Sequence, residues 1–143
     1  MREILFRGKR KDNGEWIYGS LSIEYDKSTF ISFWVLECTD ASVNLWEPKN
    51  EYYEVIQGSV GQYIGLSDKN GLKIYSGDII MGAFASNLLV GFNTESASFG
   101  ACLNTSMDII KTYWFNNDII IDKDQWVVIG NIHDNPELLN PIK

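Results

Sequence analysis

Few residues of this 143-residue chain have the types and spacing that chemistry requires. The one histidine, His133, precedes Asp134, and such a pair could bind a metal or transfer a proton. A nucleophilic triad would need a cysteine or serine beside it, and no local nucleophile motif occurs. Asp78 follows a glycine, where an aspartate commonly accepts hydrogen bonds from backbone amides in a turn. No second carboxylate stands at a motif spacing from Asp78, so we expect a turn there and no catalytic residue.

The sequence contains no recognisable binding motif for a metal or a cofactor, and we expect neither. Cys38 and Cys102 are too few for a disulfide framework, and with one histidine they cannot complete a zinc site without carboxylates. We expect both thiols to be buried and reduced in a cytoplasmic protein. Residues 1–11 lack the apolar stretch of a signal peptide, and no apolar run reaches the ~20 residues that span a bilayer, so no membrane association is expected.

The distribution of charge bears on nucleic-acid binding. The net charge is −7, yet the first 11 residues hold five of the 12 cations and a single acid. On an extended chain Arg7, Lys9 and Lys11 project from one face and could follow phosphates. The alternative, which the acidic remainder favours, is a charged edge strand that deters pairing with another sheet. The candidate phosphate-binding residues are Arg7, Lys9, Arg10 and Lys11, with Trp16 or Tyr18 nearby for stacking.

The aromatic content indicates binding to proteins. Five tryptophans and seven tyrosines exceed what a core of this size easily hides, and aromatic residues are enriched where proteins bind each other. Trp46, near Pro48 in a polar stretch, is the best candidate for an exposed anchor. The alternative is that Trp46 folds back over the core, and the sequence does not decide between the two.

The elements that must position these residues are predicted to be strands. Residues 4–6 begin a strand, and Asp12-Asn13-Gly14 predicts a hairpin with a type I′ turn before a returning strand at 16–18. The apolar run 30–36 predicts a buried strand. Residues 40–50 hold aspartate, serine, asparagine and a proline, so we expect a long loop there.

The second half shows the same alternation of short strands and turns. Strands are expected at 60–65, 73–75, 79–81, 88–92, 98–103 and 126–132, with a turn at 68–71. Their spacing is typical of a sandwich or small barrel. Residues 107–115 fit a helix or a strand equally. Asn135 followed by Pro136 predicts a helix of about one turn.

Three blocks, at residues 2–19, 60–79 and 128–139, together resemble the YopX family of bacteriophage and prophage proteins, chiefly of Gram-positive hosts. The resemblance implies a mostly β fold, a second half similar to an SH3-like barrel, and a phage or prophage origin. It implies no activity. Ile64 stands where threonine is common, and a proline frequent before the Val-Gly-Gln step is absent. His133 occupies a usually aromatic position, which implies packing.

We therefore expect a mainly β fold with a hairpin-rich segment at 1–57 and an SH3-like barrel at 58–143, or one compact unit at 1–143. The function expected is that of a non-enzymatic accessory protein that binds an unidentified protein partner and forms homo-oligomers in a bacterial cytoplasm. The alternative is a nucleic-acid-binding protein that uses the basic N-terminal strand.

Overall fold

The computed structural model describes residues 2–81, 87–94, 96–102, 112–114 and 126–139. Antiparallel strands dominate these residues, and the helical elements among them are the 3₁₀ turns η1 (Gln57–Ser59) and η3 (Pro136–Leu139). The prediction of a mainly β fold is confirmed. The chain divides into two compact units, one of residues 4–62 and one of residues 1–3 with 63–143.

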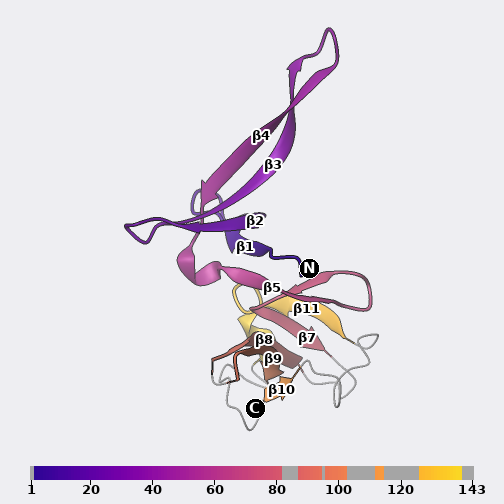
Figure 1. The fold of residues 1–143 in the computed structure, drawn as a ribbon. Coiled ribbons are helices and arrows are strands. Elements are labelled where there is room, and N and C mark those ends of the chain that lie inside the picture. The colour runs from indigo at the N-terminus through magenta and orange to yellow at the C-terminus, as the bar shows by residue number, and fades with distance from the viewer. Residues whose placement is uncertain (1, 82–86, 95, 103–111, 115–125, 140–143) are drawn as a thin grey trace. The chain divides into compact units, whose positions relative to one another are not determined.

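The first unit is built on antiparallel strands that follow one another in the chain (Figure 1). Its strands are β1 (Phe6–Lys9), β2 (Trp16–Ile23), β3 (Thr29–Asp40) and β4 (Leu45–Glu54), and the first residues of β5 (Gly61–Ser67) pair with β1. The hydrogen-bonded order in this unit is β4-β3-β2-β1-β5. Ile31 and Val55 form its buried interior, and Gly8 packs so closely against Val55 that a Cβ atom there would lie 2.9 Å from it.

The β1–β2 hairpin is confirmed, but the predicted turn type is wrong. A type I′ turn needs positive φ at two central residues, whereas Gly14 alone in this loop has one, at 73°. The Oδ1 of Asn13 instead accepts a hydrogen bond from the Glu15 amide at 2.9 Å. The amide of Gly14 donates to the Arg10 carbonyl at 2.9 Å, which closes a longer loop.

The second unit holds a five-stranded antiparallel sheet in the order β10-β9-β8-β7-β11 and a short β5–β6 pairing. Its further strands are β6 (Lys73–Tyr75), β7 (Asp78–Met81), β8 (Asn87–Asn93), β9 (Ser98–Cys102), β10 (Thr112–Trp114) and β11 (Val127–Asn131). The apolar interior consists of Ile64, Ile74, Ile80, Leu88, Val90, Ala101 and Trp126.

Every strand predicted in the second half is present within one or two residues at each described end. Residue 103, the predicted end of one strand, lies outside the described residues. Within the ambiguous stretch 107–115, Thr112–Trp114 is a strand, and the other residues lie outside the described part. The turn of helix after Asn135 is confirmed in 3₁₀ form. The SH3-like barrel and the domain division at 57 and 58 remain predictions.

No helix among the described residues is long and apolar enough to cross a membrane.

A candidate interaction surface on the β3–β4 ribbon

Strand β3 runs on well past the end of its pairing with β2. Ser20–Ile23 of β2 pair with Thr29–Ser32, and beyond Ser32 the described partner of β3 is β4 alone. The two strands continue together as a two-stranded ribbon, which Figure 1 shows as a long arm of the first unit. We call residues 33–40 and 45–51 the distal ribbon. The predicted loop at 40–50 is therefore wrong, because β4 begins at Leu45.

The two faces of the ribbon differ in chemistry, because side chains alternate along each strand. We call the first the apolar face; it carries Trp34, Leu36, Cys38, Trp46, Pro48 and Tyr52, with Asn50 among them. The opposite face begins with Phe33 and Val35 and then carries Glu37, Glu47, Lys49 and Glu51. Lys49 and Glu37 form an ion pair there at 3.4 Å. The charged side chains of Glu37, Glu47, Lys49 and Glu51 thus lie away from the apolar face.

The apolar face is largely open to solvent. Trp34 is 69% exposed, Leu36 67%, Tyr52 67% and Trp46 51%. The three aromatic side chains alone present roughly 300–450 Å², if a fully exposed one offers about 150–250 Å². A contiguous patch of several hundred Å² is often functional, unlike scattered single residues. The predicted burial of residues 30–36 is wrong beyond Ile31, because after Ser32 β3 parts from β2, whose residues 16–19 pair with β1 instead.

A hydrogen-bonded turn holds the tip of the ribbon. Asp40 Oδ1 accepts from the Ser42 hydroxyl at 2.6 Å and from its amide at 3.0 Å, which holds the pKa of the Asp40 carboxyl below its usual value. Asn44 takes a positive φ of 54° and accepts a hydrogen bond from Trp46 Nε1 at 2.9 Å. Trp46 is therefore exposed and does not fold back over the core, and its indole is held by the hydrogen bond to Asn44.

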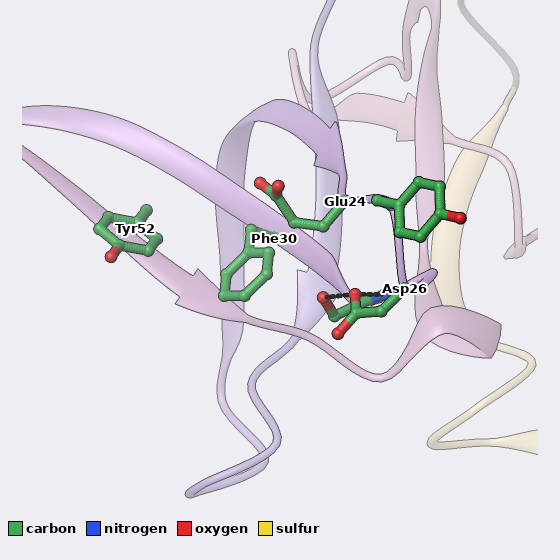
Figure 2. A pocket seen from close by; sticks show the side chains of 6 residues that line it. Glu24, Asp26, Phe30 and Tyr52 are labelled. Carbon is green, nitrogen blue, oxygen red and sulfur yellow. Dashed lines mark hydrogen bonds between the residues drawn. The ribbon is translucent and has the colours of Figure 1, made fainter.

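A hollow of about 440 Å³ lies at the base of the apolar face (Figure 2). It is lined by Glu24, Tyr25, Asp26, Ser28, Phe30 and Tyr52. The rings of Phe30 and Tyr52 are 5.7 Å apart and tilted. Asp26 accepts hydrogen bonds from the hydroxyl and amide of Ser28, which lower the pKa of its carboxyl. Aromatic surface beside carboxylates suits a positively charged side chain.

Two of the four predicted phosphate-binding residues gather over one ring. Arg7 and Lys9 both lie over Trp16, at 4.7 and 5.4 Å from the ring centroid, as expected for alternate residues of a strand. Arg7 is buried, with 6% of its surface exposed. This ring therefore serves the protein's own cations, and burial keeps Arg7 from a phosphate.

The other two predicted phosphate-binding residues, Arg10 and Lys11, form ion pairs with carboxylates. Arg10 Nε donates to Asp12 at 2.8 Å, and its guanidinium lies 3.7 Å from the centroid of the Tyr53 ring. The hydrogen bond to Asp12 raises the pKa of Arg10 and lowers that of the carboxyl. Lys11 pairs with Glu54 at 2.7 Å. The structure thus brings these cations to carboxylates and rings of their own unit.

The residues weighed for catalysis occupy turns. Asp78 is buried and accepts a hydrogen bond from the Tyr75 amide at 2.8 Å, which confirms its predicted turn role. Asp68, in the predicted turn at 68–71, accepts from the amides of Asn70 and Leu72, both at 2.9 Å. His133 is exposed, so the packing implied for it is wrong.

The cysteines separate into one buried and one exposed thiol. Cys102 is buried as expected, whereas Cys38 lies exposed on the apolar face, opposite Trp46. The expectation of two buried thiols is therefore wrong for Cys38. Among the described residues, no group of three or more histidine, cysteine or acidic side chains is placed to hold a metal ion.

Sequence reasoning identified Trp46 but missed Trp34, Leu36 and Tyr52. A signal was present in β4, where charged residues alternate with uncharged ones from Trp46 to Tyr52. Such period-two alternation is typical of a strand with two different faces. The proline and asparagine in this segment concealed the pattern, because both residues are depleted in strands.

A family model described as YopX protein matches residues 5–140 of the chain. No functionally curated protein matches the sequence. The fold is similar to the crystal structure of protein EF1440 from Enterococcus faecalis, with a TM-score of 0.55 and 21% sequence identity over 97% of this chain and 99% of that one. At this identity the likeness shows the fold alone. Because the family model covers nearly the whole sequence, the chain belongs to the YopX family.

Proposed function

We propose that the chain is a non-enzymatic accessory protein, encoded by a phage or prophage, which binds a protein partner in the bacterial cytoplasm. The observation that carries this proposal is the solvent-exposed apolar face of the β3–β4 ribbon. Water is excluded most favourably where large rings meet a complementary surface, so Trp34 and Trp46 are the expected anchors. The resemblance to phage and prophage proteins supports the proposed origin.

The partner surface that would fit has a defined chemistry. An apolar patch must cover the rings of Trp34 and Trp46, and a lysine or arginine beside it would reach the hollow at the base of the face. There Asp26 offers a carboxylate, and Phe30 and Tyr52 offer ring surface. The net charge of −7 favours the approach of a partner with a basic rim.

The test is affinity capture of tagged protein from infected or induced cells, compared between matched variants. Trp34→Lys places a charge at the centre of the apolar face. Leu72→Lys makes the same kind of change at an apolar residue of the other unit, which is 55% exposed. We expect the wild type and Leu72→Lys to retain the same partner, and Trp34→Lys to lose it by about thirtyfold or more in affinity.

Thermal unfolding of all three proteins checks that the fold is kept, because substitutions at exposed sites change stability by about 0.5 kcal/mol or less. A partner that binds Trp34→Lys as tightly as the wild type would refute the assignment of the apolar face. Binding to nucleic acid is the alternative function, and it would use the four N-terminal cations. Contacts with Trp16, Tyr53, Asp12 and Glu54 engage Arg7, Arg10 and Lys11 within their own unit, which disfavours that alternative.

A further inference from the structure

The free edge of β3 is distinct from the apolar face and is open to a second kind of contact. The Val55 amide donates to the Thr29 carbonyl at 2.8 Å, so the backbone groups of Thr29 point towards β4. Backbone groups alternate in direction along a strand, and the register with β4 is regular as far as Cys38. The N–H and C=O groups of Trp34, Leu36 and Cys38 therefore point away from β4. No described strand pairs with this edge beyond Ser32.

The two edges of the ribbon are protected differently. On β4, Pro48 stands opposite Leu36, so its backbone nitrogen faces outward and offers no N–H. Proline at such a position prevents another strand from pairing. On β3, no proline interrupts the outward row of Trp34, Leu36 and Cys38. An unprotected edge of this length is a template for another strand.

We propose that this edge of β3 pairs antiparallel with the same edge of a second copy of the chain, about a two-fold axis at Leu36. The free stretch runs from Phe33, after the pairing with β2, to Thr39, before β4 begins its return, and Leu36 is its midpoint. A two-fold axis there pairs the whole stretch with itself. Trp34 then lies opposite Cys38 of the other copy, and all outward backbone groups between them find partners.

Neighbouring registers are less favourable. An axis at Glu37 sets two carboxylates directly opposite each other, which destabilises a strand pair. An axis at Val35 sets Cys38 opposite Ser32, whose edge is already paired with Ser20 of β2. With the axis at Leu36, Glu37 lies opposite Val35. The charge pattern and the length of the free edge select the same register.

This pairing also extends the apolar face. A two-fold axis perpendicular to the sheet keeps the apolar faces of both copies on one side, as a four-stranded surface of twice the area. The inference goes beyond the proposed function, because it concerns the edge of β3 and a second copy of the chain. Since each copy carries a net charge of −7, added salt screens the repulsion and strengthens the pairing.

Sedimentation velocity on the purified protein over a range of concentrations tests the pairing. We expect a monomer–dimer equilibrium whose dissociation constant falls as salt is added. Leu36→Pro removes the outward N–H in both copies, and with it two central hydrogen bonds, so the dissociation constant should rise at least about tenfold. Leu36→Ala shortens the same side chain but keeps the N–H, and it should dimerise more tightly than Leu36→Pro. A wild type that is monomeric throughout, or equal effects of both substitutions, would overturn the inference.

Oxidative cross-linking tests the register without relying on the proline variant. Trp34→Cys places a thiol opposite Cys38 of the second copy, at a Cα separation of about 5.5 Å that a disulfide can span. In the wild type, the two Cys38 residues are about 13 Å apart along the strands and should stay unlinked. Mass spectrometry should find a link between positions 34 and 38 of different chains. A link between two residues at the same position would disprove this register.

The proposed dimer and the proposed partner binding can be refuted independently of each other. A monomeric wild type that still loses its partner on Trp34→Lys removes the edge pairing and leaves the proposed function intact. A wild type that dimerises but captures no partner removes the proposed function and leaves the edge pairing intact.

Discussion

Leu36 and Pro48 lie directly opposite each other across the β3–β4 ribbon, with their side chains on the same apolar face. Their backbone nitrogens point to opposite edges of the ribbon, and only that of Leu36 carries a hydrogen. The pair therefore makes one edge able to accept a further strand and the other unable to do so. A ribbon whose two edges differ in this way can bind a second copy without growing into an open-ended sheet.

Replacing Pro48 should remove this limit. Pro48→Thr restores an outward N–H on β4 and leaves the bonds to β3 unchanged, since the proline nitrogen does not face β3. We expect assemblies larger than the dimer, detected by light scattering after gel filtration. Pro48→Lys is the matched control, because it restores the N–H but adds a charge that protects an edge strand. Equal behaviour of the threonine variant and the wild type would contradict this role of Pro48.

Asp78→Ala should destabilise the second unit through its turn. The carboxylate is 1% exposed and accepts a hydrogen bond from the Tyr75 amide at 2.8 Å. Without it a buried donor loses that partner, which costs about 1–3 kcal/mol of the free energy of unfolding. Urea denaturation measures the loss. Asp78→Asn keeps an acceptor oxygen and should cost less, and an alanine variant as stable as the wild type would contradict the turn role.

Gly19→Ala should disrupt the pairing of β2 with β3. A Cβ atom at Gly19 would lie 2.0 Å from the carbonyl oxygen of Ser32, and backbone in a ladder cannot move aside without losing hydrogen bonds. We expect a loss of about 3 kcal/mol or more of unfolding free energy, at the upper end for an overpacked site. Gly58→Ala is the control, because nothing lies within 4 Å of the added atom. Similar melting temperatures for the two variants would refute the close approach.

Turns and short strands could be predicted from the sequence, because they are determined by residues that lie close together in the chain. Gly14 and Gly71 both have positive φ and lie in predicted turns, because glycine takes this conformation without steric cost. The strand at Lys73–Tyr75 lies at its predicted bounds, because the turn before it and the glycine after it define its ends. Asp78 could be placed in a turn from its neighbours alone.

The apolar face could not be predicted, because the burial of these residues depends on where β3 leaves the rest of its sheet. The run from Phe30 to Leu36 has the composition of a buried strand, but β3 parts from β2 after Ser32: residues 16–19 of β2 pair with β1, and β3 continues with β4 alone. Nothing local to the run encodes that. The same holds for Cys38, whose exposure follows from its place on the uncovered part of β3.

The carboxyl of Asp26 should titrate below its ordinary value because of Ser28. The hydroxyl and amide of Ser28 donate to it, which favours the charged form and lowers the pKa from 3.8. This contribution to stability is complete above pH 3.8 and is lost as the pH falls through the lowered pKa. Ser28→Ala should move the pKa back towards 3.8, as measured by NMR of the carboxyl carbon. Ser42→Ala should do the same for Asp40 and leave Asp26 unchanged; an Asp26 pKa unaffected by Ser28→Ala would contradict the assignment.

Single- and double-stranded DNA should not bind the wild type measurably, even at low salt, where phosphate contacts are strongest. The reason is that Arg10 and Lys11 are paired with Asp12 and Glu54, Arg7 is buried, and the chain as a whole carries a charge of −7. Asp12→Asn combined with Glu54→Gln frees two cations and should produce weak binding that falls as salt is added. Fluorescence anisotropy titrations across a salt series distinguish the two proteins. Salt-dependent binding by the wild type would show that the ion pairs open for phosphate, and it would favour the nucleic-acid alternative over the protein partner.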